Sequence, residues 1–279
     1  MQVVNDLVCG DAYIIEGQSN ALATDTDEKS PSEANEWIRS YGRPSQNPKD
    51  NQGNLWHQGE NNQGTDGPTG DYDWKAYQDY FVEMSGAWKQ DFPSLQHTYV
   101  FQIWPNSCSI AGDTGAGDMI REIQRSLPLL YSHMSVMSTL GIKPPGSCHF
   151  PLVGWADFAR LIQPLIERDH YGRKFSDSIT PPNLRSARFT SVSKEAIALE
   201  FDQPIVWTDA LNGQFHLDGE KDKVASGTLS GNVIMLKLKR PSGVTKITYL
   251  KESEWSQDKL VMGANGIAAL SFCDVPISD

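Results

Sequence analysis

The sequence predicts an α/β fold with a parallel sheet, followed by a small all-β domain that resembles a sandwich. In the first part, residues 1–172, strand-like apolar runs alternate with amphipathic helices, which is typical of a layered fold with a parallel sheet. In the second part, residues 184–279, short strand-like runs follow one another with turn residues between them. Between them, residues 173–183 contain Ser, Thr and a Pro-Pro pair, and we predict a linker there.

Hydrophobic periodicity gives the order of elements in the first part. Apolar runs predict strands at residues 7–16, 36–41, 98–104 and 134–139. A helix is predicted over residues 73–90, because apolar and aromatic residues recur there at helical spacing. Two further helices are predicted within residues 120–130 and 155–166. The segment 47–70 is dense in Asn, Gln, Gly and Asp and is predicted to be a loop.

The second part contains a series of short predicted strands and no internal repeat. Each run is bounded by turn residues, as in a β-sandwich. The predicted strands lie at residues 186–190, 196–201, 215–217, 233–238, 246–250 and 268–272.

Charge and hydropathy exclude two classes of partner. The formal net charge is −11, and Lys and Arg form no basic stripe, so a nucleic-acid partner is not expected. No apolar run of about 18 residues is present, so a membrane partner is not expected either. Residues 1–9 are too short and too polar for a signal peptide, and a mature secreted chain or a fragment stays open. A neutral or weakly charged substrate suits an acidic protein best.

The cysteines do not predict a metal site. There are four, widely spaced and without a CxxC pair, so zinc is not expected. Cys9 and Cys273 lie in apolar strand-like runs and are predicted to be buried thiols. Cys108 and Cys148 lie in loop-like stretches and could pair, which leaves the redox compartment open.

Ser19 stands where a nucleophile would be exposed. The predicted first strand runs into Gly17, and Ser19 follows two residues later. In an open parallel sheet, ligands bind just beyond the carboxyl ends of the strands. Backbone N–H groups after the glycine could face an oxyanion. The alternative is a serine that caps the next helix.

A second polar block follows Trp56. Gln58 and Asn61 flank a glycine and suit donors aimed at developing negative charge. Glu60 could orient a histidine, and the alternative is a polar loop held by its own hydrogen bonds. His57 and Glu60 have HxxE spacing, but neither a helical context nor a third ligand is evident, so no metal is predicted.

His149 is the strongest candidate for a general base. It lies in a loop before the last predicted helix, from which it could reach a serine at the edge of the sheet. A serine hydroxyl is a weak nucleophile until a neighbouring imidazole takes its proton. The alternative is a surface or capping histidine. The weaker candidates are His97, His133, His170 and His216.

Four blocks resemble the sialate O-acetylesterase family of the SGNH (GDSL-like) hydrolases, a group of carbohydrate acetylesterases. In order they are DAYIIEGQSNA, LWHQGENN, REIQ and GSCHFPLVGWADFARLI. The closing ANGIAALSFCDVPI resembles the C-terminal part of bacterial members, so the resemblance touches nearly the whole chain. The combination of GQSN and WxQGE in this order is fairly specific. The resemblance implies a flavodoxin-like SGNH three-layer α/β/α domain over residues 1–172, and no cofactor.

The resemblance also implies roles for individual residues. Ser19 would be the nucleophile, His149 the general base, and the oxyanion hole would come from the Ser19 amide with Gln58 and Asn61. The substrate would be an acetylated carbohydrate, and the location secreted or periplasmic.

The chain departs from the family pattern in two places. The family commonly has an Asp three residues before the histidine, where this chain has Gly146. We therefore take Glu60 as the third catalytic group, with Asp157 behind it and a backbone carbonyl as a further alternative. The interval between Ser19 and Trp56 is also too short for the strand, helix and oxyanion loop that the family has there. A missing segment would expose a sheet edge, which makes a homo-oligomer conceivable.

The sequence thus favours a serine carbohydrate esterase that hydrolyses short acyl esters through an acyl-serine intermediate. The first rival is a weak or inactive carbohydrate-binding protein on the same scaffold, with tryptophans that could stack on sugar rings. These tryptophans are Trp56, Trp104 and Trp155. The second rival is an interaction module whose β domain docks a partner.

Overall fold

The structure of the protein is a computed structural model, which describes seven segments of the chain. The predicted strand at 36–41 lies outside the described residues, as do Cys9 and the pair Cys108 and Cys148. Cys273 is described as a free thiol, and burial raises its pKa to about 12. The described residues are 12–17, 21, 51–60, 74–105, 116–142, 150 and 152–279.

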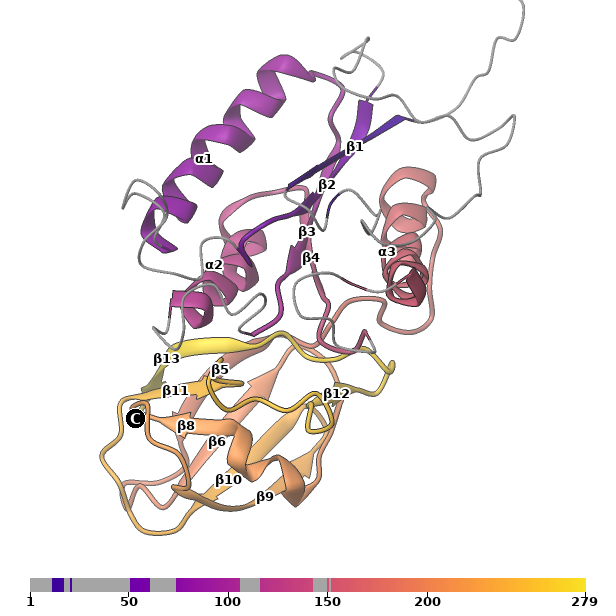
Figure 1. Ribbon diagram of the computed structural model, residues 1–279. Helices are drawn as coiled ribbons and strands as arrows, with labels where there is room; N and C mark the ends of the chain where they lie inside the picture. The colour runs from indigo at the N-terminus through magenta and orange to yellow at the C-terminus, as the bar shows by residue number, and fades with distance from the viewer. Residues whose placement is uncertain are drawn as a thin grey trace, which may run out of the picture.

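Four parallel strands form the sheet of the first part. They are β1 (Ala12–Gly17), β2 (Asn51–His57), β3 (His97–Gln102) and β4 (Met134–Ser138). Their order in the sheet is β1-β2-β3-β4, and every neighbouring pair is parallel (Figure 1). The carboxyl ends of all four strands therefore meet at one edge of the sheet.

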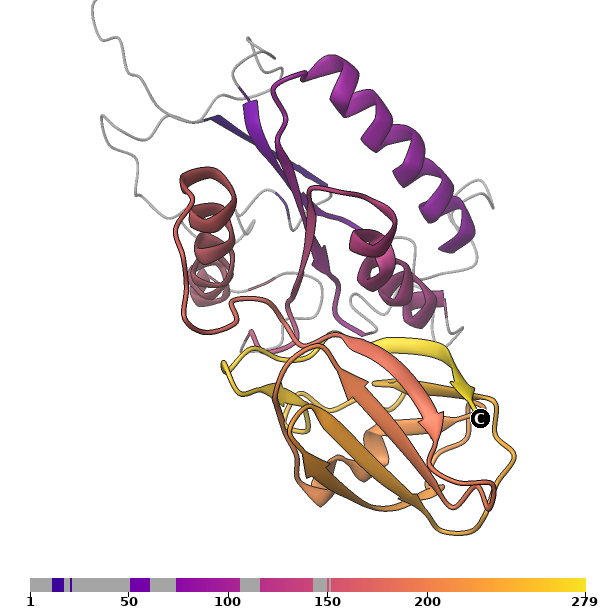
Figure 2. The same ribbon diagram turned by 180° about the vertical axis from the view of Figure 1, so that it is seen from behind.

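Three helices cover the two faces of this sheet. Helices α1 (Trp74–Asp91) and α2 (Ala116–Leu130) lie on one face, and α3 (Leu152–Tyr171) lies on the other, as both views show (Figures 1 and 2). Helix α1 forms where the aromatic spacing predicted it. The prediction of an α/β fold with a parallel sheet is confirmed. None of the helices that the structure describes is long and apolar enough to span a bilayer.

The prediction of a loop over residues 47–70 is wrong for its first part. Strand β2 occupies Asn51–His57 and pairs with β1 on one side and β3 on the other. The backbone of a strand between two others is hydrogen-bonded on both sides, and this satisfies N–H and C=O groups whatever the side chains. Pairing within the sheet therefore overrides the weak strand propensity of the Asn, Gln and Gly residues that open β2.

The second part forms one seven-stranded sheet and a two-stranded ribbon, where the sequence predicted a sandwich-like arrangement. The sheet has the order β8-β11-β13-β5-β6-β10-β9, and the ribbon pairs β12 with β7. Only β13 and β5 pair in parallel. Aromatic side chains of β8, β11 and β13 stack on one another inside the curl of the sheet. The strands are β5 (Leu184–Phe189), β6 (Ala196–Phe201), β7 (Ile205–Val206), β8 (Phe215–Leu217), β9 (Val224–Ser230), β10 (Val233–Leu238), β11 (Lys246–Tyr249), β12 (Met262–Gly263) and β13 (Phe272–Ser278). A 3-10 helix, η5 (Asp209–Gln214), precedes β8.

The two parts share one hydrophobic core. Trp104, Leu140 and Phe150 of the first part lie in the same buried cluster as the aromatic and aliphatic residues of the curled sheet. The segment 173–183, which we predicted as a linker, forms no helix or strand. It is nevertheless fixed, because the Pro182 carbonyl accepts a hydrogen bond from the Leu270 amide at 3.0 Å.

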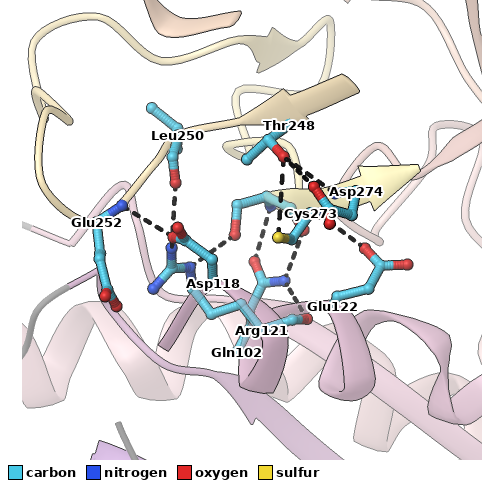
Figure 3. Close-up of polar contacts among 10 residues, drawn as sticks. Gln102, Asp118, Arg121, Glu122, Thr248, Leu250, Glu252, Cys273 and Asp274 are labelled. Carbon is cyan, nitrogen blue, oxygen red and sulfur yellow. Dashed lines mark hydrogen bonds and ion pairs between the residues drawn. The ribbon is translucent and has the colours of Figure 1, made fainter. Parts of the chain in front are cut away.

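A buried polar seam joins α2 to the β strands (Figure 3). Arg121 forms an ion pair with Asp118 and donates to the Leu250 carbonyl at 3.1 Å and to the Ser271 hydroxyl at 3.0 Å. Asp118 in turn accepts the Glu252 amide at 2.8 Å. Because an uncompensated charge in a protein interior costs several kcal/mol, the two parts must stay in register for these charges to remain paired.

Replacing Arg121 by Leu should destabilise the whole chain strongly. The change leaves the buried Asp118 carboxylate without its cation, which typically costs about 3–5 kcal/mol. Arg160 also pairs with an aspartate three residues earlier, Asp157, but its side chain is 73% exposed. Arg160→Leu should therefore cost less than about 1 kcal/mol. Urea unfolding at neutral pH measures both, and equal losses would contradict the account of the seam.

Candidate active site at the carboxyl edge of the parallel sheet

The structure describes two of the five predicted site residues. Gln58 and Glu60 follow β2 directly, at the carboxyl edge of the sheet. Ser19, Asn61 and His149 lie outside the described residues, so their predicted roles stay predictions. What the structure does describe is the position of the chain next to each of them.

The exits of β1 and β2 lie in direct contact. Gly17, the last residue of β1, is paired with His57, the last residue of β2. Gly17 has a φ of +143°, and a Cβ on it would lie 1.9 Å from the His57 carbonyl oxygen. Only glycine fits this backbone conformation and this approach. The chain that leads to Ser19 therefore departs from a fixed point beside β2.

His57 is buried in a box of aromatic rings. Its imidazole stacks on Phe158 of α3, with centroids 5.2 Å apart and an interplanar angle of 8°. Phe101 of β3 and Phe150 each lie with their centroids 5.6 Å from it. The Nε2 atom of His57 lies 3.0 Å from the Glu60 carboxylate, and both side chains are almost completely buried. The ring thus contacts three separate segments that surround the edge of the sheet.

The sequence analysis did not predict that His57 would be the buried residue that these three segments contact. The spacing to Glu60 was visible, and it suggested only a metal site, which we rejected. Among the described residues, no group of three His, Cys, Asp or Glu side chains could hold a metal ion. The burial of His57 depends on Phe101 and Phe158, which are distant in sequence, so no local pattern could have predicted it.

The turn after β2 is held from the side of α1 and α2. The Gln58 carbonyl accepts hydrogen bonds from Gln124 Nε2 at 2.9 Å and from the Tyr77 hydroxyl at 3.3 Å. Burial raises the pKa of Tyr77 to about 12, so this hydroxyl stays protonated and able to donate. Trp56 Nε1 donates to the same hydroxyl at 3.3 Å.

Two of the three tryptophans considered for sugar stacking serve the core instead. Trp56 packs edge-on against Trp88, with centroids 5.4 Å apart. Trp104 is only 4% exposed and donates to the Thr139 carbonyl at 2.8 Å. Asp157, the second choice for the third catalytic group, bonds to Arg160 at 2.5 Å.

A serine and a histidine that the sequence analysis did not pair, Ser135 and His97, meet at the opposite edge of the sheet. Ser135 Oγ lies 2.9 Å from His97 Nε2, beside a cavity of about 730 Å³. The carboxylate of Asp169 lies 3.4 Å from the same ring nitrogen, and Arg168 donates to Ser135 at 3.2 Å. In a catalytic triad the carboxylate must bind the other ring nitrogen, so that the first is free to act as a base. This cluster therefore lacks the arrangement of a triad.

Comparison with known proteins shows that the fold is similar to that of a solved structure. The sequence matches no protein-family model and no curated protein. Among solved structures, the chain is similar to a carbohydrate acetylesterase from Xanthomonas citri, with a TM-score of 0.63 and 18% sequence identity. The match covers 79% of this chain and 49% of that structure, so the chain spans about half the length of the protein it matches. At this identity the likeness shows a shared fold.

The environment of His97 makes its pKa unusually low. Burial lowers the pKa of His97 to about 4 from an ordinary value of 6.5. The negative charge of Asp169 opposes this shift. The nearby positive groups add to it, and they are Arg168, His170 and His133. Between pH 6.5 and 4 the unfolded chain therefore binds more protons at this position than the folded chain does.

His97→Asn should reduce the sensitivity of the fold to acid. In the wild type, the stability that neutral His97 provides is complete above about pH 6.5 and is lost as the pH falls toward 4. One group can contribute a slope of at most about 1.4 kcal/mol per pH unit. Urea unfolding from pH 7 to pH 4.5 should give a shallower loss for the variant. Parallel curves for the two proteins would show that His97 does not titrate as described.

Proposed function

We propose that the chain is a serine carbohydrate esterase that removes acetyl or similar short acyl groups from a sugar. Ser19 Oγ attacks the ester carbonyl while His149 takes its proton. The sugar leaves as an alcohol after His149 returns that proton, and an acyl-serine remains. Water, activated by the same imidazole, then attacks the acyl-serine and releases the carboxylate and the free serine.

The observation that carries this proposal is the convergence at His57. Gly17, two residues before Ser19, is paired with His57 in the sheet. Phe150, the residue after His149, packs its ring against the imidazole of His57. Two residues of chain reach at most about 7 Å. The backbone of Ser19 and that of His149 are therefore each within this reach of a residue that contacts or pairs with His57. Positions 19 and 149 are 130 apart in sequence, and a shared origin at the carboxyl edge is what the proposed proton transfer needs.

The fold supports the same proposal. A flavodoxin-like sheet has the strand order 2-1-3-4-5. The order β1-β2-β3-β4 agrees with it if the second strand is left out, and helices cover both faces of the sheet. We therefore propose an SGNH-type three-layer domain. The fold of a carbohydrate acetylesterase over 79% of the chain supports a carbohydrate ester as the substrate class.

We propose Glu60 as the acidic group of the site. Its carboxylate is buried and lies 3.0 Å from His57 Nε2. If Glu60 orients His149, its carboxylate must contact His57 and His149 at the same time. We therefore expect a lower rate than in an enzyme whose aspartate contacts the catalytic histidine alone. The Ser19 amide, with Gln58 and Asn61, would stabilise the oxyanion. Such donors typically contribute about 100-fold or more to the rate, so measurable turnover should remain.

Ser19→Ala should lower kcat for 4-nitrophenyl acetate by several orders of magnitude. No other group takes the place of the nucleophile in the proposed mechanism, so only the oxyanion donors and substrate binding would still act. Ser135→Ala is the matched control, since Ser135 also bonds to a histidine but at the opposite edge of the sheet. A fluorophosphonate should label Ser19 and leave Ser135 free, as judged by peptide mass spectrometry. Turnover that survives in Ser19→Ala and falls in Ser135→Ala would reject the proposal.

A second candidate function is carbohydrate binding without catalysis. Gly146 in place of an acid, together with the engagement of Glu60 by His57, favours it. The two functions separate in one comparison, in which calorimetry measures binding of an acetylated oligosaccharide and the assay measures acetate release. Binding without release would select the second candidate.

A further inference from the structure

We propose that Gln124 of α2 is a positioning residue for the active site, which it serves by fixing the turn Gln58-Gly59-Glu60. This inference rests on the proposed function, because the turn would carry an oxyanion donor and the acidic group. Gln124 itself would touch no substrate. Its role would be to hold the backbone from which those groups extend.

The side-chain amide of Gln124 is fully buried and makes three hydrogen bonds. Its Nε2 donates to the Gln58 carbonyl at 2.9 Å and to the Tyr77 hydroxyl at 3.2 Å. Its Oε1 accepts the Ile103 amide at 3.0 Å, just after β3. Both amide hydrogens are therefore used, and the orientation of the amide is fixed. One side chain thus ties the turn after β2 to α1 and to the end of β3.

Gly59 brings the turn into contact with this amide. Its φ is +141°, and a Cβ built on it would lie 3.0 Å from Gln124 Nε2. The next nearest atoms would be side-chain carbons of Ile120 at 3.2 Å and Ile103 at 3.3 Å. The turn is thus packed against α2 without free space, so a change in the Gln124 side chain acts directly on the turn.

The opposite side of the turn is held by His57 and Glu60. With their contact at 3.0 Å, the turn is fixed between the aromatic box and α2. Catalytic groups need placement to within about 1 Å, and a displacement of that size can cost about 100-fold in rate. Gln124 is therefore placed to affect catalysis through the position of the turn.

Gln102 provides a matched control. It is fully buried as well, and its Nε2 donates to the Arg121 carbonyl and the Ser271 carbonyl, both at 2.9 Å. Its Oε1 accepts the Ser271 amide at 2.9 Å. Gln102 therefore has the same residue type, burial and number of side-chain bonds, but it joins α2 and β3 to Ser271, just before β13, and makes none of its three bonds to the turn (Figure 3).

The test compares Gln124→Met with Gln102→Met in the full chain. Both should lower the urea midpoint, since each removes three buried hydrogen bonds. Hydrogen exchange of the amides at 55–60 should accelerate about tenfold or more in Gln124→Met and stay at the wild-type rate in Gln102→Met. For 4-nitrophenyl acetate, kcat should fall about 10- to 100-fold in Gln124→Met with little change in KM. In Gln102→Met, kcat should stay close to wild type.

Gln124→Glu gives a second variant with its own signature. An ionised carboxylate can still accept the Ile103 amide but cannot donate to the Gln58 carbonyl. Protonation restores one donor, so the kcat of this variant relative to wild type should rise as the pH falls. A merely structural role would not produce that pH profile.

The outcomes separate the two proposals. Unchanged exchange at 55–60 in both Gln124 variants overturns the positioning role, whether or not the protein is an esterase. Equal losses of kcat in Gln124→Met and Gln102→Met also overturn it. Accelerated exchange in Gln124→Met, together with no turnover in the wild-type chain, would leave Gln124 as the residue that fixes the turn and would reject the esterase. Accelerated exchange with a selective loss of kcat supports both.

Discussion

The arrangement of this protein depends on one constraint, which is that the buried polar side chains of α2 must all be paired. Helix α2 lies between the parallel sheet and the β strands of the second part, so its polar groups cannot turn to water. Arg121 finds its partners at Leu250 and Ser271, which flank β11 and β13, and Gln124 finds its partners around the edge of the parallel sheet. Unpaired, each would cost about 1–5 kcal/mol, so these contacts select one relative placement of the parts.

This constraint gives the second part a role in the proposed site. Arg121, which anchors the second part (Figure 3), and Gln124 lie three residues apart on the same helix. The curled sheet shares the buried cluster of Phe150, which packs on His57. The second part therefore acts as the support against which the carboxyl edge of the parallel sheet is built. We expect the two parts to unfold together rather than as independent domains.

Local patterns predicted the elements that bury a continuous apolar face. The spacing of Tyr77, Phe81 and Trp88 predicted α1, and these three residues are its buried ones. Strand β2 was missed because its polar residues are stabilised by pairing on both sides, which a single segment does not reveal. Strand β9 was missed because it is an edge strand with few apolar residues. Sequence motifs predicted Ser19 as the nucleophile and His149 as the base. The contacts of His57 and Gln124 join segments that are distant in sequence, so no local pattern could predict them.

The most direct test of the account is a crystal structure of the protein after reaction with a small phosphonate. The account predicts phosphorus bonded to Ser19 Oγ, with a ring nitrogen of His149 within about 3 Å of a phosphonate or serine oxygen. It also predicts that Gly17 and Phe150 keep their contacts with His57 in that structure. Phosphorus on another residue, or an imidazole of His149 on a different side of the molecule from Ser19, would contradict the proposal that these two residues form one catalytic site.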